Sequence, residues 1–327
     1  MSLLPFQRAS EIPTEAAALT RWLVEGLWSE QAVGILGGEP KCCKSFLALD
    51  LAVSVASGTA CLRRYPVRQA GRVLLFPAED SLAVVRRRLE GICAAAGMGL
   101  ASLPVDVITA PVLRLDSEAD RQRLTNTVAS LRPVLLILDP MIRLHRLDEN
   151  DASQIAVLLS YLRELQRRFQ VAVLLVHHAR KDSHGSRPGQ ALRGSSELHG
   201  WGDSNLYMRR RGSQLTLTTE HRAAPSQDNI PLQLTESGSA LALTVVTGLP
   251  AGAAPAGSTH PAPAAATPLE RVRQVLAELQ GPASAERIRE LCGMRTASVG
   301  ESLAALARQG LVVRDARGYR LSGSAAA

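Results

Sequence analysis

The sequence predicts an α/β protein in which a parallel sheet, flanked by helices, carries appended antiparallel strands and is followed by a small C-terminal domain. Three observations lead to this fold class. Runs of Val, Ile and Leu alternate with segments of helical apolar spacing over the first part of the chain. A glycine-containing turn joins the first of these runs to the first long helical segment. A stretch rich in Pro, Ala and Gly then precedes a shorter segment with helical patterns of its own.

Five apolar runs are the candidate parallel strands, and helical segments separate them. The expected strands are Ala32–Gly37, Arg72–Pro77, Val105–Thr109, Val134–Leu138 and Val171–Val176. The expected helices are Ser45–Ser57 (with Gly58 as its C-cap), Ser81–Ala96, Ser117–Leu131 and Asp151–Phe169. Residues 1–30 are interpreted as a lead-in that contains one amphipathic helix at Glu15–Leu27.

Shorter strands are expected beyond these elements. Asn205–Arg211 and Gln214–Glu220 flank a Gly-Ser turn and therefore predict a β-hairpin. Two more apolar segments follow at Ile230–Leu234 and Ala240–Val246. We expect these strands to be antiparallel and to extend the parallel sheet, so that the large domain spans residues 31–247.

A linker and a small domain are expected after the sheet. Residues 248–267 carry no formal charge and are rich in Pro, Ala and Gly, which is typical of a flexible linker. Residues 268–323 show three helical patterns and a short hairpin, an order that resembles a winged helix. Its third helix and wing would offer DNA the side chains of Arg295, Thr296, Ser298, Arg308, Arg314, Arg317, Tyr319 and Arg320. The alternative is a winged helix that contacts protein, which Glu301 on the third helix favours.

Composition sets broader limits. The 327 residues carry a net charge of +7, which favours a polyanionic partner such as DNA, although an Arg-rich genome is an alternative explanation. The five cysteines lack zinc-ligand spacing and are expected to be reduced thiols. The sequence shows no pattern of a signal peptide and no apolar run of roughly 18 residues, so we expect a cytoplasmic protein without a membrane span.

The sharpest motif is Gly37-Gly-Glu-Pro-Lys-Cys-Cys-Lys-Ser45. Gly38, Lys44 and Ser45 fit the phosphate-loop pattern GxxxxGK[ST] between a strand and a helix. Such a loop wraps phosphates with backbone N–H groups, while its lysine contacts the phosphates and its serine hydroxyl binds magnesium. We therefore expect ATP and Mg²⁺ as ligands. The residues expected to bind the nucleotide are Gly38, Glu39, Pro40, Lys41, Cys42, Cys43, Lys44, Ser45 and Phe46.

Cys43 departs from this pattern, because glycine is expected at its position. If the backbone there is left-handed, a side chain costs about 1–2 kcal/mol. The side chain could also crowd the phosphates. The alternative interpretation is therefore a degenerate loop that no longer binds nucleotide.

Acidic residues follow two of the predicted strands. Asp139 ends the strand Val134–Leu138, and a carboxylate at the carboxyl edge of a parallel sheet can hold magnesium beside the phosphates. Glu79 and Asp80 follow another strand. We expect Glu79 to be the general base for the attacking water and Asp80 to cap the next helix. The alternative for Glu79 and Asp139 is likewise a helix-capping role.

Two further candidates are less specific. His177 and His178 end the strand Val171–Val176 and could sense the γ-phosphate, or could simply be a solvated strand end. Arg193 follows in a loop with Gly194 and two serines, where it could reach a neighbouring subunit's nucleotide. From the sequence alone, an ordinary surface arginine is the favoured interpretation of Arg193.

Several segments in this order resemble one family. They are GEPKCCKSFLALDLA, VLLFPAED, LLILDP, VLLVHHARK and LRGSSELHGWGDS. Over roughly residues 30–245 the chain resembles the RecA-like ATPases of the RepA type, which are hexameric plasmid replicative helicases, and their mobile-element relatives. The resemblance implies a RecA-like sheet, a ring of six subunits and ATP bound between subunits.

The resemblance also implies a role for each site residue. Lys44 and Ser45 would hold the phosphates and magnesium, and Asp139 would be the magnesium-side carboxylate. The catalytic base would be Glu79. His178 would be the phosphate sensor. Arg193 would be the arginine finger that acts across the subunit interface. Cys43 and the C-terminal extension depart from the family pattern.

The combined interpretation is an ATP-hydrolysing motor that acts on DNA in replication or maintenance of a mobile element. A hexameric helicase is one form that such a motor could take. The first alternative is a DNA-binding regulator that ATP switches with little or no turnover, which Cys43 favours. The second is a nucleotide-binding scaffold that does not bind DNA.

Overall fold

The computed structural model divides the chain into two compact units, Met1–Leu249 and Pro250–Ala327. The structure describes residues 4, 6–11, 21–149, 151–178, 196–246, 268–279, 281–292, 296–315 and 318–322. The expected linker and Arg193 therefore lie outside the described residues.

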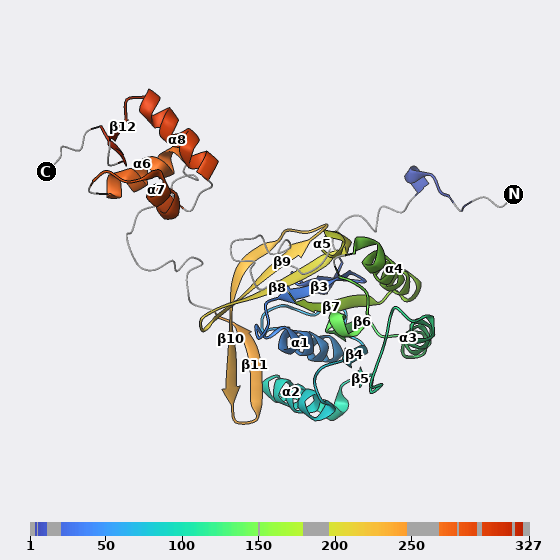
Figure 1. Ribbon diagram of the computed structural model, residues 1–327. Helices are drawn as coiled ribbons and strands as arrows, with labels where there is room; N and C mark the ends of the chain where they lie inside the picture. The colour runs from blue at the N-terminus through green and yellow to red at the C-terminus, as the bar shows by residue number, and fades with distance from the viewer. Residues whose placement is uncertain are drawn as a thin grey trace. The chain divides into compact units, whose positions relative to one another are not determined.

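A nine-stranded sheet forms the centre of the first unit (Figure 1). Its strand order is β11-β10-β9-β8-β3-β7-β6-β4-β5, and the pairs between β8 and β5 are parallel. The strands are β3 Val33–Gly38, β4 Val73–Pro77, β5 Val105–Val107, β6 Leu135–Asp139, β7 Ala172–His178, β8 Ser204–Arg211, β9 Gln214–His221, β10 Gln227–Ser237 and β11 Ala240–Val245. The expected fold class, a RecA-like parallel sheet with appended antiparallel strands, is confirmed.

Helices cover both faces of the sheet (Figure 1). They are α1 Lys44–Ser57, α2 Leu82–Ala95, α3 Glu118–Leu131, α4 Ala152–Phe169 and α5 Ser196–Trp201, with short 3₁₀ helices η1 Ala9–Glu11, η3 Leu100–Ser102 and η4 Met141–Arg143. Successive strand residues point to opposite faces. Leu36 of β3 therefore joins the core under α1 and α2, whereas Ile35 joins the core under α3 and α4. Among the described helices, none is both long and apolar enough to cross a membrane.

The lead-in differs from the expected helix at Glu15–Leu27. Residues 12–20 lie outside the described part, and the rest of that range forms a strand, β1 Trp22–Val24, which pairs with β2 Trp28–Ser29. Gly26 has a φ of +72° in the turn between them, a conformation that ends a helix and suits a hairpin. Leu23, Leu27 and Trp28 are fully buried. The apolar residues of this segment therefore belong to a packed hairpin and not to one face of an amphipathic helix.

The last two strands of the sheet form a long hairpin. β10 is longer than the sequence predicts, and the hairpin of β10 and β11 runs beside α1 and α2 (Figure 1). Gly91 of α2 permits this approach, because a Cβ at that position would lie 3.0 Å from the Cβ of Leu241. The hairpin therefore packs against the helix layer next to α1.

The second unit contains three helices and one hairpin around its own apolar core. Its elements are α6 Pro268–Glu278, α7 Ala285–Cys292, α8 Thr296–Arg308, β12 Val312–Asp315 and β13 Gly318–Leu321. Val272, Ile288 and Leu306 are fully buried at the centre. Tyr319 of β13 exchanges backbone hydrogen bonds with Ala283, at 2.8 and 3.0 Å, so the hairpin is fixed to the turn between α6 and α7.

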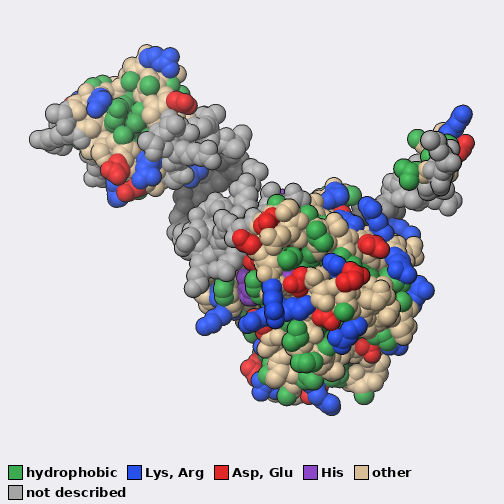
Figure 2. Space-filling view, turned by 45° about the vertical axis from the view of Figure 1, so that its right-hand side comes forward, with side chains coloured by type: hydrophobic (Ala, Val, Ile, Leu, Met, Phe, Trp, Pro, Cys, Tyr) green, Lys and Arg blue, Asp and Glu red, His purple; other side chains and the backbone are tan. Residues whose placement is uncertain are grey.

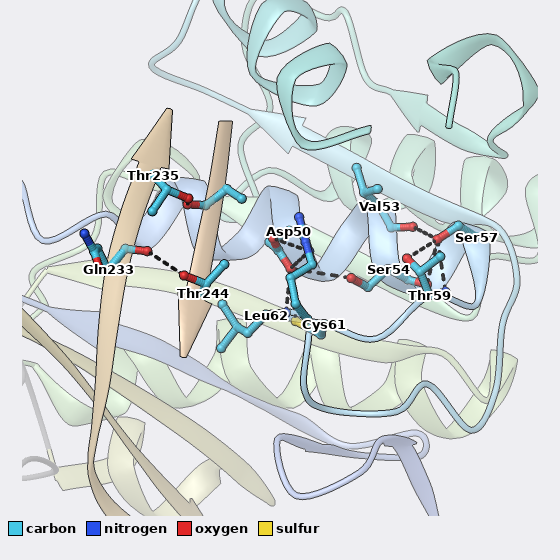
Figure 3. A network of polar contacts seen from close by, with 12 residues as sticks. Asp50, Val53, Ser54, Ser57, Thr59, Cys61, Leu62, Gln233, Thr235 and Thr244 are labelled. Atoms are coloured by element: carbon cyan, nitrogen blue, oxygen red, sulfur yellow. Dashed lines mark hydrogen bonds and ion pairs between the residues drawn. The ribbon is translucent and has the colours of Figure 1, made fainter. Parts of the chain in front are cut away.

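A buried carboxylate anchors α1 within the first unit (Figure 3). Asp50 is fully buried, its Oδ1 accepts from the Leu62 N–H at 3.0 Å, and its Oδ2 accepts from Arg63 Nη1 at 3.1 Å. Burial raises the pKa of the Asp50 carboxyl, and Arg63 opposes this rise. Removing one partner of such a buried pair typically costs about 3–5 kcal/mol, so this contact fixes the helix that follows the phosphate loop.

Candidate nucleotide-binding site

The predicted phosphate loop lies between β3 and the N-terminus of α1. Gly38 has a φ of +153°, and a Cβ there would lie 2.3 Å from the Met208 carbonyl oxygen, so only glycine fits beside β8. The side chain of Cys43, the N-cap residue of α1, makes no capping hydrogen bond. The backbone N–H groups of a helix N-terminus attract anions, and Cys43 does not occupy these N–H groups with its side chain.

Lys44 is the central cation of the loop. Its side chain is buried, and Nζ donates to the carbonyl oxygens of Gly38 at 3.0 Å and Glu39 at 2.8 Å. Burial lowers the pKa of Lys44, while Cys42 and Asp139 act in the opposite direction. The ammonium group is thus held inside the loop, where a phosphate group would meet it.

Cys43 takes the strained conformation that its position demands. Its φ is +67° and its ψ is 24°, in the left-handed region, and Lys41 has a φ of +64°. Arg210 at the end of β8 reaches this turn: Nη2 lies 3.3 Å from the Cys43 Sγ, and Nε donates to the Lys41 carbonyl oxygen at 3.1 Å. A side chain from the neighbouring strand therefore braces the loop at the point where glycine is missing.

Asp139 lies at the carboxyl end of β6, beside Ser45. Burial raises the pKa of Asp139 to about 6, and the Ser45 hydroxyl opposes this rise. A hydroxyl and a carboxylate are oxygen donors of the kind that Mg²⁺ takes, so Ser45 and Asp139 fit a magnesium ion that also contacts phosphates. Within the described chain, His, Cys, Asp and Glu form no group of three that could hold a metal ion alone. A magnesium ion shared with the phosphates agrees with both observations.

Two more carboxylates follow β4, and each is paired with an arginine. Glu79 Oε1 accepts from Arg143 Nε at 2.8 Å, and both side chains are partly exposed. Asp80 pairs with Arg88 of α2. The expectation that Asp80 caps α2 is wrong: the N-cap is Ser81, whose Oγ accepts from the Val84 N–H at 3.4 Å. Serine supplies the short acceptor that a helix start favours, and Asp80 is left to pair with Arg88.

The two histidines at the end of β7 differ in burial and in the residues near them. His178 pairs in register with Gly38 and is partly exposed. His177 is buried, and its Nδ1 lies 3.9 Å from Glu149 Oε1. Of the pair, only His178 reaches the phosphate loop.

One cleft of about 390 Å³ brings these side chains together. It is lined by the loop residues from Lys41 to Phe46 together with Glu79, Asp139 and His178. The sequence had not indicated that Arg88, Leu234 and Leu241 also line it. Arg143 and Arg210 were likewise missed, because nothing in the linear pattern shows which arginine a carboxylate or a loop will meet.

A second hollow of about 630 Å³ lies between α4 and α5. Arg163, Arg167 and Trp201 line it, and Arg163 is held by an ion pair with Asp203. The described residues that line this hollow include no phosphate loop and a single carboxylate, Glu164. The cleft beside α1 is therefore the candidate site.

The fold and this cleft define a RecA-like P-loop protein. The family described as AAA domain matches residues 4–184, more than half of the sequence, and the chain belongs to this family. A search of curated proteins gave no match.

Two solved structures are similar to this chain. One is a DnaB-like replicative helicase, studied with its interactions with primase, at 14% identity and a TM-score of 0.52; the match covers 65% of this chain and 57% of that chain. The other is the RadB recombinase, at 16% identity and a TM-score of 0.49, covering 66% of this chain and 91% of that chain. The likeness to the helicase shows the fold alone.

The raised pKa of Asp139 predicts how metal-dependent binding changes with pH. Below about pH 6 the carboxyl holds a proton, which competes with Mg²⁺, and above it the carboxylate is free to bind. We therefore expect the affinity for magnesium–ADP to fall as the pH is lowered through about 6, while Asp139→Asn binds weakly at every pH. Calorimetric titration at several pH values, with and without Mg²⁺, measures this. An equal pH dependence in Asp139→Asn would contradict the assignment.

Proposed function

We propose that this protein is an ATP-hydrolysing motor that acts on DNA in replication or maintenance of a mobile element. The observation that carries the proposal is the convergence of Lys44, Ser45, Asp139 and Glu79 in one cleft. Phosphoryl transfer needs mostly positioning and charge stabilisation, and these side chains supply both.

In the proposed mechanism the loop from Gly38 to Ser45 binds the triphosphate with its backbone N–H groups. Lys44 offsets negative charge on the phosphates. Ser45 and Asp139 would hold a magnesium ion, which would supply further positive charge. Glu79 orients a water and accepts its proton for in-line attack on the γ-phosphate. His178, which pairs in register with Gly38 at the end of β7, would sense the γ-phosphate.

Glu79 must change partner before it can act as the base. Its carboxylate is paired with Arg143, and both side chains are partly exposed, at 43% and 62%. An exposed pair of this kind contributes only about 0–1 kcal/mol, so a bound nucleotide and its water can displace it. The pair is therefore weak enough to allow turnover.

Assembly into a ring belongs to the same proposal. Among the described residues, the lysines and arginines that line the cleft are Lys41, Lys44 and Arg88. An arginine from a neighbouring subunit would add charge where the transition state needs it, and Arg193 stays our prediction for this finger. The RepA type and the six-membered ring likewise stay predictions that rest on the sequence resemblance.

DNA as the partner is supported by charge and by the second unit. The sequence has a net charge of +7, but Lys and Arg are interspersed with Asp and Glu on the face shown in Figure 2. The excess of positive charge is therefore not concentrated on that face. In the second unit, three helices and a hairpin follow the order of a winged helix, and we propose that it binds duplex DNA.

The wing of this unit presents side chains suited to a phosphate backbone. Arg314 lies over the ring of Tyr319, 5.4 Å from its centroid, and Arg320 pairs with Asp315 at 3.5 Å. Arg314 and Arg308 are exposed. Cationic groups of this kind position a protein on DNA without selecting its sequence.

A second candidate function is a DNA-binding regulator that ATP switches. It is favoured by the left-handed Cys43, because the strain of a side chain at this point and its proximity to the phosphates would slow turnover. The motor predicts hydrolysis that DNA accelerates. The regulator predicts tight nucleotide binding with little hydrolysis.

The choice of catalytic base gives a first prediction for this function. Glu79→Gln should keep ATP binding and lose hydrolysis by about 10²-fold or more, the scale of general-base removal. Asp80→Asn is the matched control, because Asp80 is the adjacent carboxylate and pairs with Arg88. This variant should retain most of the hydrolysis activity. Steady-state phosphate release and ATP titration measure both. A more severe loss in Asp80→Asn would show that the base is Asp80.

The role of the second unit gives another prediction. Deleting residues 248–327 should weaken duplex DNA binding about tenfold or more and reduce its salt dependence, while basal ATP hydrolysis survives, because each unit has its own core. Arg314→Ala in the full chain should give a smaller loss in the same direction. Fluorescence anisotropy at several salt concentrations measures both. Equal DNA affinity of the truncated protein would indicate that this unit contacts protein instead.

A further inference from the structure

One arginine contacts both residues of the phosphate loop that have an unfavourable backbone. Lys41 and Cys43 have φ angles of +64° and +67°, in the left-handed region that disfavours any residue with a Cβ. Arg210 Nε donates to the Lys41 carbonyl oxygen at 3.1 Å, and Arg210 Nη2 lies 3.3 Å from the Cys43 Sγ. The guanidinium group therefore bridges the two left-handed positions of the loop.

The sheet fixes the place of this arginine. β8 pairs in parallel with β3 as far as Met208, which lies opposite Gly38, and then continues beyond the end of β3. Side chains two residues apart on a strand point to the same face, so Arg210 lies on the face of Met208, whose side chain belongs to the core under α1. Arg210 also pairs in register with Leu215 of β9. A strand that is paired on both sides thus carries the guanidinium group to the loop.

Arg210 contacts the loop outside the cleft. It is not among the described residues that line the cleft, whereas Lys41 and Cys43 both are. Arg210 therefore acts on a bound nucleotide through the loop. An arginine suits this task, because its planar fork of N–H groups can contact two acceptors in a fixed geometry, which the ammonium group of a lysine does not reproduce.

We propose that Arg210 is a positioning residue of the phosphate loop and that it compensates for the glycine missing at position 43. By holding Lys41 and Cys43 in the left-handed conformation, it keeps the backbone N–H groups of the loop arranged for phosphate. Without Arg210 fewer molecules hold the loop in this arrangement, and the apparent nucleotide affinity falls in the same proportion. This role rests on the proposed function, because phosphates must occupy the loop.

The test is a double-mutant cycle between positions 210 and 43. Binding of magnesium–ADP is measured by calorimetry on the full chain, on Arg210→Ala, on Cys43→Gly and on the double variant. We expect Arg210→Ala to weaken binding about tenfold when Cys43 is present, but about twofold or less in the Cys43→Gly background, because glycine adopts the left-handed conformation without strain. A loss that arose only from damage to β8 would be equal in both backgrounds.

Two further variants separate geometry from charge. Arg210→Lys keeps the charge but loses the paired contact, so we expect it to bind almost as weakly as Arg210→Ala. Arg211→Ala removes the same charge from the next residue of β8, whose side chain points to the opposite face, and should bind ADP as the unaltered chain does. Arg210 and Arg211 are both exposed, so these variants should fold, which circular dichroism checks.

The outcomes separate this role from the proposed function. Unchanged affinity in Arg210→Ala, an equal loss in both backgrounds, or full affinity in Arg210→Lys would overturn the positioning role alone. A tenfold loss in Arg211→Ala would also overturn it, since long-range charge would then explain the effect. An unaltered chain that binds no nucleotide would overturn the proposed function and the role of Arg210 with it.

Discussion

The candidate site depends on one geometric constraint, the common carboxyl edge of four parallel strands. Because β3, β4, β6 and β7 run in the same direction, residues far apart in the sequence meet where these strands end. Asp139 pairs in register with Pro77, two residues before Glu79, and His178 pairs with Gly38 at the start of the loop. Tight packing of alternate strand residues on both faces fixes this edge, so the chemistry of the cleft follows from the sheet.

Paired charges surround the phosphate loop. Lys44 bonds to the loop carbonyls, Arg88 to Asp80 and Arg143 to Glu79, while burial favours the protonated form of Asp139. A magnesium nucleotide brings both signs of charge, so it can replace these pairs without leaving a buried charge unpaired. We therefore propose that nucleotide binding replaces these ion pairs with contacts to the phosphates and the metal ion.

The periodic elements were predictable from the sequence, since buried strands and capped helices have strong local signals. The phosphate loop and Asp139 could be located in the same way, because each adjoins a continuous apolar strand. The hairpin at Trp22–Ser29 was not predictable, since its short apolar spacing also fits a helix. Nor could the sequence show that Arg210 braces Cys43, or that Leu234 reaches the cleft, because both contacts depend on how β8 and β10 pack.

The role of the phosphate loop is tested most directly by the rate of ATP hydrolysis by the full chain and by Lys44→Ala, each with and without single-stranded DNA. We expect the unaltered protein to hydrolyse ATP, DNA to accelerate the reaction, and Lys44→Ala to fall to the background rate in both conditions. Equal turnover in the unaltered protein and in Lys44→Ala would contradict this role, because the loop could not then be the site of phosphoryl transfer.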